Sequence, residues 1–441
     1  MYLNESYAKK WAPVLDHPEL PKIEDNYKRA VTALVLENQE RALIEENRSM
    51  QNLWETAPAN AVGGGMSPVV GGEGGIKGFD PILIGLVRRA LPNLMAYDIC
   101  GVQPMTGPTG LIFAMRSVYA SSSARGGEAL YQEANTGHSG NAATGTLATL
   151  GTNPANTALF GTQNTGTGFS TAYGEDKTLA YMGFQIDRVS VVAKTRGLQA
   201  AYTLELAQDL KAIHGLDAET ELTNILSTEI LAEINREVVR TVYATANSGI
   251  TATSQNTFNL SSATDTSGRW QVEKYKSLLF AIERAANKIA KDTRRGKGNM
   301  LIVSTDVASA LAMTGLLDYN SALSGQTNLT VDDTGNTFAG TLFGRIKVYV
   351  DPYSVSGTDY CVVGYKGTTP YDAGLFYCPY VPLQMVRAIN PTTYQPQVGF
   401  KTRYGLVSNP FAGGTNTSLN GALTDDTNVY YRKFSVLNIN Q

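Results

Sequence analysis

Aliphatic side chains recur at every fourth position between residues 222 and 242, and this spacing places them on one side of a helix. Asp217 precedes the segment and is a good helix N-cap, while glutamates and arginines occupy the other faces. The aliphatic positions are Leu222, Leu226, Ile230, Ile234, Val238 and Val242. We predict a helix over residues 217–243, about 40 Å long at 1.5 Å per residue, which is enough to span a domain.

The remainder of the second half mixes helices with mostly non-alternating strands, which indicates an α+β domain. Helices are predicted at residues 198–215, closed by Gly215, and at 272–292 and 306–313. Strands are predicted at residues 184–196, 300–304, 346–350, 360–364 and 374–378.

The chain has 441 residues with 43% hydrophobic content, which allows a sizeable core and two or three domain-sized units. A net charge of −3 gives the whole chain no electrostatic footprint for nucleic acid or anionic membrane. No apolar run approaches the roughly 20 residues of a membrane-spanning helix, and no signal peptide is present, so cytosolic synthesis and assembly are expected. The three cysteines, Cys100, Cys361 and Cys378, are predicted to be buried thiols.

The amino-terminal part changes character abruptly near residue 57. Residues 23–52 are charged and helical in pattern, with Tyr27, Val31 and Val35 on one stripe, which is typical of a partner-binding helix. Residues 57–78 are almost free of charge and rich in glycine, which predicts a flexible linker or arm.

Residues 84–116 run from an apolar helix through a turn rich in Pro and Gly into the strand-like sequence LIFAM. Arg88 and Arg89 lie between aliphatic residues, so one helical face can be buried while the arginines remain available for carboxylates of a partner. This stretch holds no catalytic constellation.

Residues 120–180 are rich in Gly, Ser, Thr, Asn and Ala and carry few charges. A structureless loop of this length is unusual in a compact domain. Two interpretations stay open: a disordered insert, or a long hairpin with a small module that packs on a neighbouring subunit.

No motif supports an enzyme, a metal site or a cofactor site. The sequence GGEGGIKG lacks the Ser or Thr that follows the lysine of a P-loop, and the three histidines lack metal-ligand spacing. No GxSxG elbow occurs. The basic run KIAKDTRRGKG at residues 288–298 is interpreted as a solvated helix end and turn, in preference to an inner or interfacial surface. We therefore predict no catalytic, metal-binding or cofactor-binding residue.

Several segments resemble the major capsid proteins of T-even-type tailed bacteriophages. The elements VRRA, PNL, DICGVQPM and PTG occur in the family's order within residues 84–116. The run AAYTLELAQDLKAIHG followed by EINREVV, and the later runs LFYCPYVPLQM and GFKTRYGLVSNPF, are similar as well. The resemblance covers nearly the whole chain and is weakest at residues 1–55 and 120–180.

This resemblance implies the HK97-type capsid fold, in which residues 217–243 form the long spine helix. The implied organisation begins with a scaffold-binding pro-segment (1–55), an amino-terminal arm (56–80) and the first part of a peripheral domain (81–116). An extended loop with an insertion domain (117–183), the second peripheral part (184–245), an axial domain (246–371) and a return to the peripheral domain (372–441) follow.

The resemblance also suggests a processing site. Proteases of related proheads cut after Leu or Ile, any residue, and Glu, and Leu53-Trp54-Glu55 matches just before the linker. We expect cleavage between Glu55 and Thr56. Matches at residues 43–45, 44–46 and 231–233 show that the motif is weak, and only its position favours Glu55.

The implied function is that of a shell subunit. Many copies form rings of six or five that join into an icosahedral or elongated shell around packaged DNA, which is not bound sequence-specifically. Arg88 and Arg89 are the predicted inter-subunit contacts. The implied partners are further copies of the chain, a scaffold protein, a prohead protease, and vertex, portal and decoration proteins, with assembly in the bacterial cytoplasm. One alternative is the related capsid vertex protein, which copy number per particle would distinguish from the major capsid protein. The other is a soluble α+β enzyme, which would be an active monomer or small oligomer.

Overall fold

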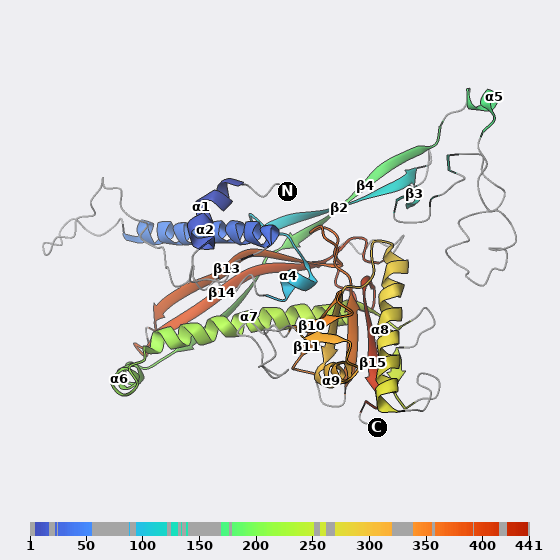
Figure 1. Cartoon of the computed structure of the whole chain (residues 1–441). Coiled ribbons are helices and arrows are strands. Elements are labelled where there is room, and N and C mark those ends of the chain that lie inside the picture. Colours follow the sequence, from blue (N-terminus) through green and yellow to red (C-terminus); the bar gives the residue numbers. More distant parts are fainter. Residues whose placement is uncertain are drawn as a thin grey trace.

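The computed structural model describes residues 5–16, 23, 25–54, 88, 94–120, 125–130, 134, 138–139, 169–175, 179–250, 256–261, 270–319, 338–354, 358–390, 392–413 and 421–439. Helices and sheets are mixed, which confirms the predicted α+β class. The long helix α7 (Ala218–Thr245) runs from beneath a sheet of long strands to a second sheet of short strands (Figure 1).

Helix α7 forms as its sequence pattern predicts. The Asp217 side chain accepts a hydrogen bond from the Glu219 N–H, which satisfies one of the otherwise unpaired donors of the first turn. Ile230, Ile234, Val238 and Val242 are buried in the largest core cluster of the molecule. Gly215, which precedes the helix, adopts a φ of +67°, a conformation that favours glycine.

The long-stranded sheet has four strands in the order β1 (Gly101–Val102), β13 (Leu375–Ile389), β14 (Pro396–Ser408) and β5 (Lys194–Ala201). Strand β1 is parallel to β13, and the other pairs are antiparallel. Helix α7 lies along one side of the long strands (Figure 1). On the other side lies a pair of amino-terminal helices, α1 (Glu5–Leu15) and α2 (Asn26–Trp54), of which α2 packs against β13.

The second sheet has eight strands and its own core. Its main order is β6 (Ala246–Ser248), β15 (Asn428–Leu437), β12 (Asp359–Gly364), β8 (Met300–Ser304), β11 (Ile346–Asp351), β10 (Phe338–Leu342) and β9 (Leu317–Tyr319), and β7 (Thr257–Asn259) also pairs with β15. Helices α8 (Gln271–Thr293) and α9 (Thr305–Met313) pack on this sheet through aliphatic side chains.

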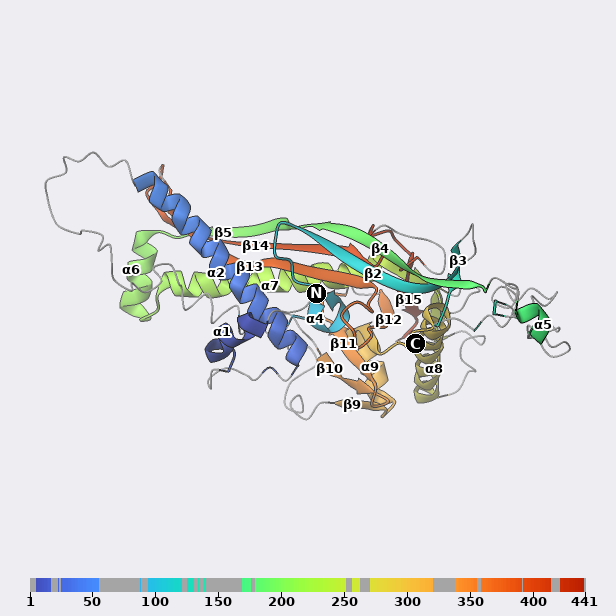
Figure 2. The same cartoon turned by 90° about the horizontal axis from the view of Figure 1, so that it is seen from above.

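A third sheet projects away from these two units (Figure 1). Strands β2 (Thr109–Ala120) and β4 (Tyr181–Val192) pair along their whole length, and the short β3 (Arg125–Glu128) lies beside β2. We call the pair β2–β4 the ribbon. A small helix, α5 (Thr171–Gly174), lies beyond its far end (Figure 2). Most residues of the predicted insertion in the segment 117–183 lie outside the described residues.

The structure corrects two expectations about secondary structure. The sequence 184–196 is not one strand, because β4 ends at Val192 and β5 begins at Lys194. The predicted helix over 198–215 is shorter, since α6 (Leu204–Ile213) begins after Thr203, whose hydroxyl accepts a hydrogen bond from the Leu206 N–H. Residues 198–201 instead pair with β14, so long-range pairing overrides their local helical pattern.

The strands of residues 372–441 divide between two sheets. Strands β13 and β14 do lie in the long-stranded sheet, but β15 pairs with β12 in the eight-stranded sheet. The last strand of the chain therefore completes the sheet that residues 246–371 begin.

Candidate assembly surfaces

The ribbon exposes a continuous apolar face. Paired residues of an antiparallel ribbon lie on the same face, and Met115 pairs with Ile186, Ser117 with Phe184, and Tyr119 with Met182. The large exposed side chains of this face are Leu111, Phe113, Met115, Met182, Phe184 and Ile186, of which Phe184 is 73% exposed. Six neighbouring exposed apolar side chains form a patch of the kind that marks a protein–protein interface.

The opposite face of the ribbon is covered within the chain. Ile112, Val189 and Val191 belong to a core cluster with Phe376 of β13 and Val407 of β14. The ribbon is thereby anchored at its base on the long-stranded sheet. A ribbon of mainly two strands is only marginally stable in water when its apolar face is uncovered. This face is therefore a candidate surface for contact with a partner.

One charged side chain interrupts the apolar face. Arg188 pairs with Phe113 across the ribbon and is exposed. Among the described residues, Arg188 has no ion-pair partner. An exposed arginine inside an apolar patch is a common composition for the centre of an interface.

A second apolar surface lies at the end of the molecule around α6. Helix α6 buries none of its residues, and Leu204, Leu206 and Ile213 are exposed. Ile389 and Tyr394, at the turn between β13 and β14, are also largely exposed. Packing within the monomer therefore contributes little to the stability of this helix.

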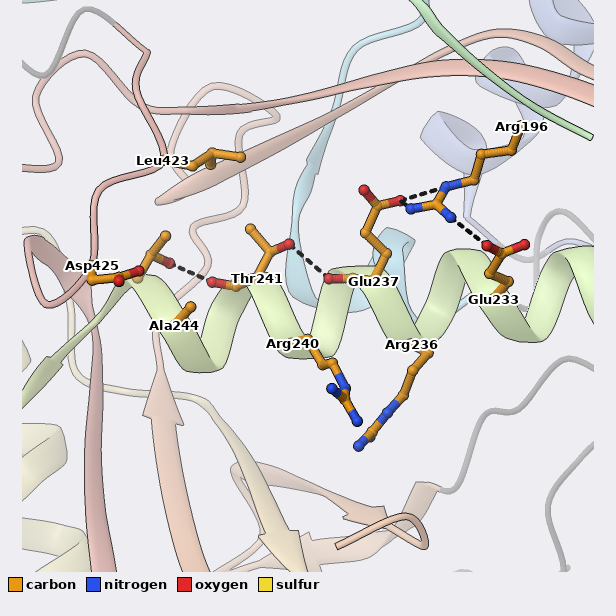
Figure 3. A pocket seen from close by; sticks show the side chains of 10 residues that line it. Arg196, Glu233, Arg236, Glu237, Arg240, Thr241, Ala244, Leu423 and Asp425 are labelled. Carbon is orange, nitrogen blue, oxygen red and sulfur yellow. Dashed lines mark hydrogen bonds and ion pairs between the residues drawn. The ribbon is translucent and has the colours of Figure 1, made fainter.

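A charged cleft of about 450 Å³ lies beside α7 (Figure 3). The Arg196 guanidinium of β5 donates to Glu237 at 2.8 Å and also to Glu233. Arg236 and Arg240 extend to the opposite side of α7 from Arg196 (Figure 3). Ion pairs across the cleft join β5 to α7. The residues that line the cleft include no nucleophile next to a general base.

Arg236 connects α7 to the eight-stranded sheet. Its Nη1 lies 2.6 Å from Oδ1 of Asp351, at the end of β11, and the Tyr360 hydroxyl donates to the same carboxylate. Burial alone would raise the pKa of Asp351, but the hydrogen bonds from Arg236, Tyr360 and the Tyr353 N–H outweigh burial and hold that pKa below its usual value. The buried carboxylate is therefore charged and ties the two sheet units together.

The structure places Arg88 in an unexpected environment. Its side chain is only 2% exposed, and Nη2 donates to the carbonyl of Leu15 at 2.8 Å. The sequence predicts an arginine available to a neighbouring subunit, whereas within the monomer Arg88 is covered by the amino-terminal segment. The other predicted site residues, Arg89, Glu55 and Thr56, lie outside the described residues.

Helix α2 hydrogen-bonds to residues 98–105 and to β13. The Tyr27 hydroxyl donates to the carbonyl of Val102, and Lys28 Nζ lies 2.9 Å from Oδ1 of Asp98. The Asn38 amide donates to the carbonyls of Met105 at 2.7 Å and Tyr380 at 3.1 Å. Helix α2 therefore satisfies main-chain acceptors along this edge.

Gln39 of α2 is fully buried, and neither its amide nitrogen nor its amide oxygen has a hydrogen-bond partner in the part of the chain that the structure describes. A buried polar group without a partner costs about 1–3 kcal/mol. Gln39→Leu is therefore expected to raise the free energy of unfolding by about 1 kcal/mol, as measured by urea denaturation. The exposed control Lys9→Leu should change it little, and a destabilised Gln39→Leu chain would contradict this interpretation.

The remaining sequence motifs have structural roles. Leu231 of the alternative cleavage motif is buried in α7, whereas Glu233, the last residue of that motif, is partly exposed. In the basic run, Lys288 pairs with Asp292 at 2.7 Å and Arg295 with Glu128 at 3.0 Å, so these charges are used within the chain. Arg294 ends α8 in a left-handed conformation.

The three cysteines are buried thiols, as predicted. Burial raises the pKa of Cys100 and Cys378 to about 12, so neither sulfur is a reactive thiolate at neutral pH. Within the described ranges, no three His, Cys, Asp or Glu side chains are grouped to hold a metal ion. Over the same residues, the helices are too short or too polar to span a membrane.

The exposed ribbon was not predicted as a site. Its signal is the alternation of large apolar side chains on two distant segments, Leu111, Phe113 and Met115 in one and Phe184 and Ile186 in the other. Alternation alone does not say which face is buried by the chain itself, so the sequence could predict the strands without assigning the surface.

Comparisons with known proteins agree with these features. A family model described as major capsid protein Gp23 matches residues 76–436. The major capsid protein of Serratia phage KSP90 is 38% identical over 99% of this chain and 99% of its own length. The major capsid protein of Enterobacteria phage T4 is 36% identical over 91% of each chain, and the capsid vertex protein of the same phage is 27% identical over 54% of this chain and 55% of its own.

A solved structure titled the capsid of Myoviridae phage XM1 is similar at a TM-score of 0.38 and 10% identity, covering 76% of this chain and 90% of that one. Sequence identity of more than a third over almost the full length settles the family, and the relatives that match it are structural proteins. The chain therefore belongs to the Gp23 family of phage major capsid proteins, whose role in the virion is structural and not enzymatic.

Proposed function

We propose that copies of this chain form rings of six, or of six and five, that join into a closed icosahedral or prolate shell, and that in the mature shell the ribbon carries the contact between neighbours. The observation that supports this role is the exposed apolar face of the ribbon, which is anchored at one end and has no partner among the described residues of the monomer. Burial of Phe113, Met115, Phe184 and Ile186 against a second copy would contribute roughly 1.5–3 kcal/mol per side chain.

The proposed organisation keeps the expected order of parts. Residues 1–55 bind the scaffold, 56–80 form an arm, and 117–183 form the extended loop, of which the ribbon is the described portion. The long-stranded sheet with α7 serves as the peripheral domain, and the eight-stranded sheet as the axial domain, now including β15. Arg89 is kept as a seam contact, and Arg88 becomes one only when the segment that covers it departs.

We propose processing between Glu55 and Thr56 during maturation. Support comes from the sequence, where Leu53-Trp54-Glu55 immediately precedes the uncharged linker. Intact mass spectrometry of the chain from mature particles is expected to show a species that begins at Thr56. A retained Met1 in those particles would exclude this cleavage, and a chain that begins at Glu46 would assign it to the earlier motif.

The proposed partners are the scaffold protein and prohead protease during assembly in the bacterial cytoplasm, and vertex, portal and decoration proteins in the finished head. The shell encloses DNA without reading its sequence, which agrees with the net charge of −3.

Negative-stain microscopy of the chain expressed with its scaffold protein tests the proposed assembly. Closed particles built mainly from this chain are expected. Copy number separates the proposed role from that of a vertex protein, since hundreds of copies per particle are expected and a vertex protein contributes far fewer. A monodisperse monomer under these conditions would contradict the proposal.

A further inference from the structure

The amino-terminal helices cover one particular surface of the chain. This surface, which we call the masked edge, consists of residues 98–105 together with the adjoining part of β13 around Tyr380. Lys28 is paired with Asp98, and Tyr27 and Asn38 are hydrogen-bonded to carbonyls of the masked edge. Val31, Val35 and Leu36 of α2 share a core cluster with Val102 and Tyr377. Polar and apolar contacts of one segment thus cover the masked edge.

We propose that the segment 5–54 is a mask that occupies, within its own chain, the seat for the ribbon of a neighbouring copy. Removal of the mask opens the seat, and the apolar face of the neighbour's ribbon then takes its place. This inference rests on the proposed role of the chain in a shell and on its proposed cleavage after Glu55. It assigns to that cleavage a specific consequence, which is the exchange of an intramolecular cover for an intermolecular one.

The chemistry of the uncovered surface fits the ribbon. Loss of α2 uncovers apolar side chains, and the ribbon is the projecting element whose apolar face lacks cover. Loss of Lys28 also removes the cation that forms an ion pair with the Asp98 carboxylate, while the hydrogen bond to Tyr349 keeps that carboxylate oriented. Arg188 is the exposed cation inside the apolar face of the ribbon. An apolar surface with one carboxylate thus meets an apolar surface with one guanidinium, which favours this partner over an acidic or purely apolar one.

Some contacts of the mask favour its release after cleavage. The amide of Gln39 is buried without a partner, and the side-chain nitrogen of Gln103, in the masked edge, is likewise buried and unpaired among the described residues. Unsatisfied polar groups weaken the attachment of the mask relative to its buried apolar area. Once the covalent link is cut, only non-covalent contacts hold the segment on the masked edge, and the ribbon of a neighbour competes with them.

A cross-linking experiment on the full chain tests the exchange. A recognition sequence for a site-specific protease is inserted between Glu55 and Thr56, and Gln103→Cys and Met115→Cys place one thiol in the masked edge and one on the ribbon. The three native cysteines are buried and do not compete for a short thiol-specific cross-linker. Particles assembled with scaffold are treated before and after proteolysis, and cross-linked chains are counted by denaturing electrophoresis. Met115→Cys paired with Lys276→Cys, on the exposed face of α8, is the matched control.

Proteolysis is expected to raise the yield of Gln103–Met115 inter-chain cross-links at least tenfold and to leave the control pair unchanged. The additional substitution Gln39→Leu is expected to slow release of the cleaved segment about tenfold, with a parallel delay in cross-linking. Equal yields before and after proteolysis would overturn the mask, as would cleaved particles that lack the cross-link. Absence of particles from the unmodified chain would instead overturn the proposed shell function, and the mask with it.

Discussion

Phe184→Asp is expected to abolish formation of the cleaved, mature shell and to leave the folded monomer intact. Phe184 is 73% exposed on the apolar face of the ribbon, so its replacement should change the free energy of unfolding by no more than about 0.5 kcal/mol. In a shell, the same position would bury a carboxylate against apolar side chains, at a cost of several kcal/mol for every neighbour contact. Electron microscopy and chemical denaturation measure the two effects separately.

Phe184→Leu is the matched control for this prediction, because it keeps an apolar side chain at the same position. It is expected to form normal particles. Phe113→Asp, on the other strand of the ribbon, should reproduce the loss. Normal mature particles from either aspartate variant would show that the ribbon face is not a contact between subunits.

Asp351→Asn is expected to lower the free energy of unfolding by about 3 kcal/mol, because it leaves the partly buried Arg236 guanidinium without its counter-charge. The substitution keeps the shape of the side chain, so the loss reports the charge and its hydrogen bonds. Urea denaturation at neutral pH measures the effect. Asp306→Asn, at an exposed position in the first turn of α9, is the control and should cost less than about 0.5 kcal/mol.

The same carboxylate gives stability a defined dependence on pH. The pKa of Asp351 is lower in the folded chain than in the unfolded chain, so its contribution is present above the unfolded value of about 3.9 and is lost as pH falls through the folded value. Wild-type stability should therefore decrease more steeply below about pH 4 than that of Asp351→Asn. Parallel stability curves for the two chains in acid would contradict this assignment.

Local patterns predicted the regular elements well. The N-cap at Asp217, the four-residue spacing of aliphatic side chains and Gly215 all lie within residues 215–242, and the bounds of α7 agree with them closely. The strand β8 has the predicted bounds of 300–304. Helix α8 differs from prediction by one residue at each end. These elements form as expected because their caps and apolar faces are local properties of the chain.

Contacts between distant segments could not be predicted in this way. The buried position of Arg88 depends on a carbonyl 73 residues earlier in the chain, and the place of β15 depends on pairing with β12. The ribbon is built from segments that are separated by about 60 residues of polar sequence, and a period of two does not say which face another part of the chain will cover.

The sequence by itself determined the family, the α+β class, the long helix and the buried thiols, because these depend on residue identity and local spacing. Only the tertiary structure decided which apolar face stays exposed, which sheet receives the last strand, and which arginine the amino-terminal helices cover. Those outcomes depend on competition among surfaces that are far apart in the chain, and burial is resolved only when all of them are packed together.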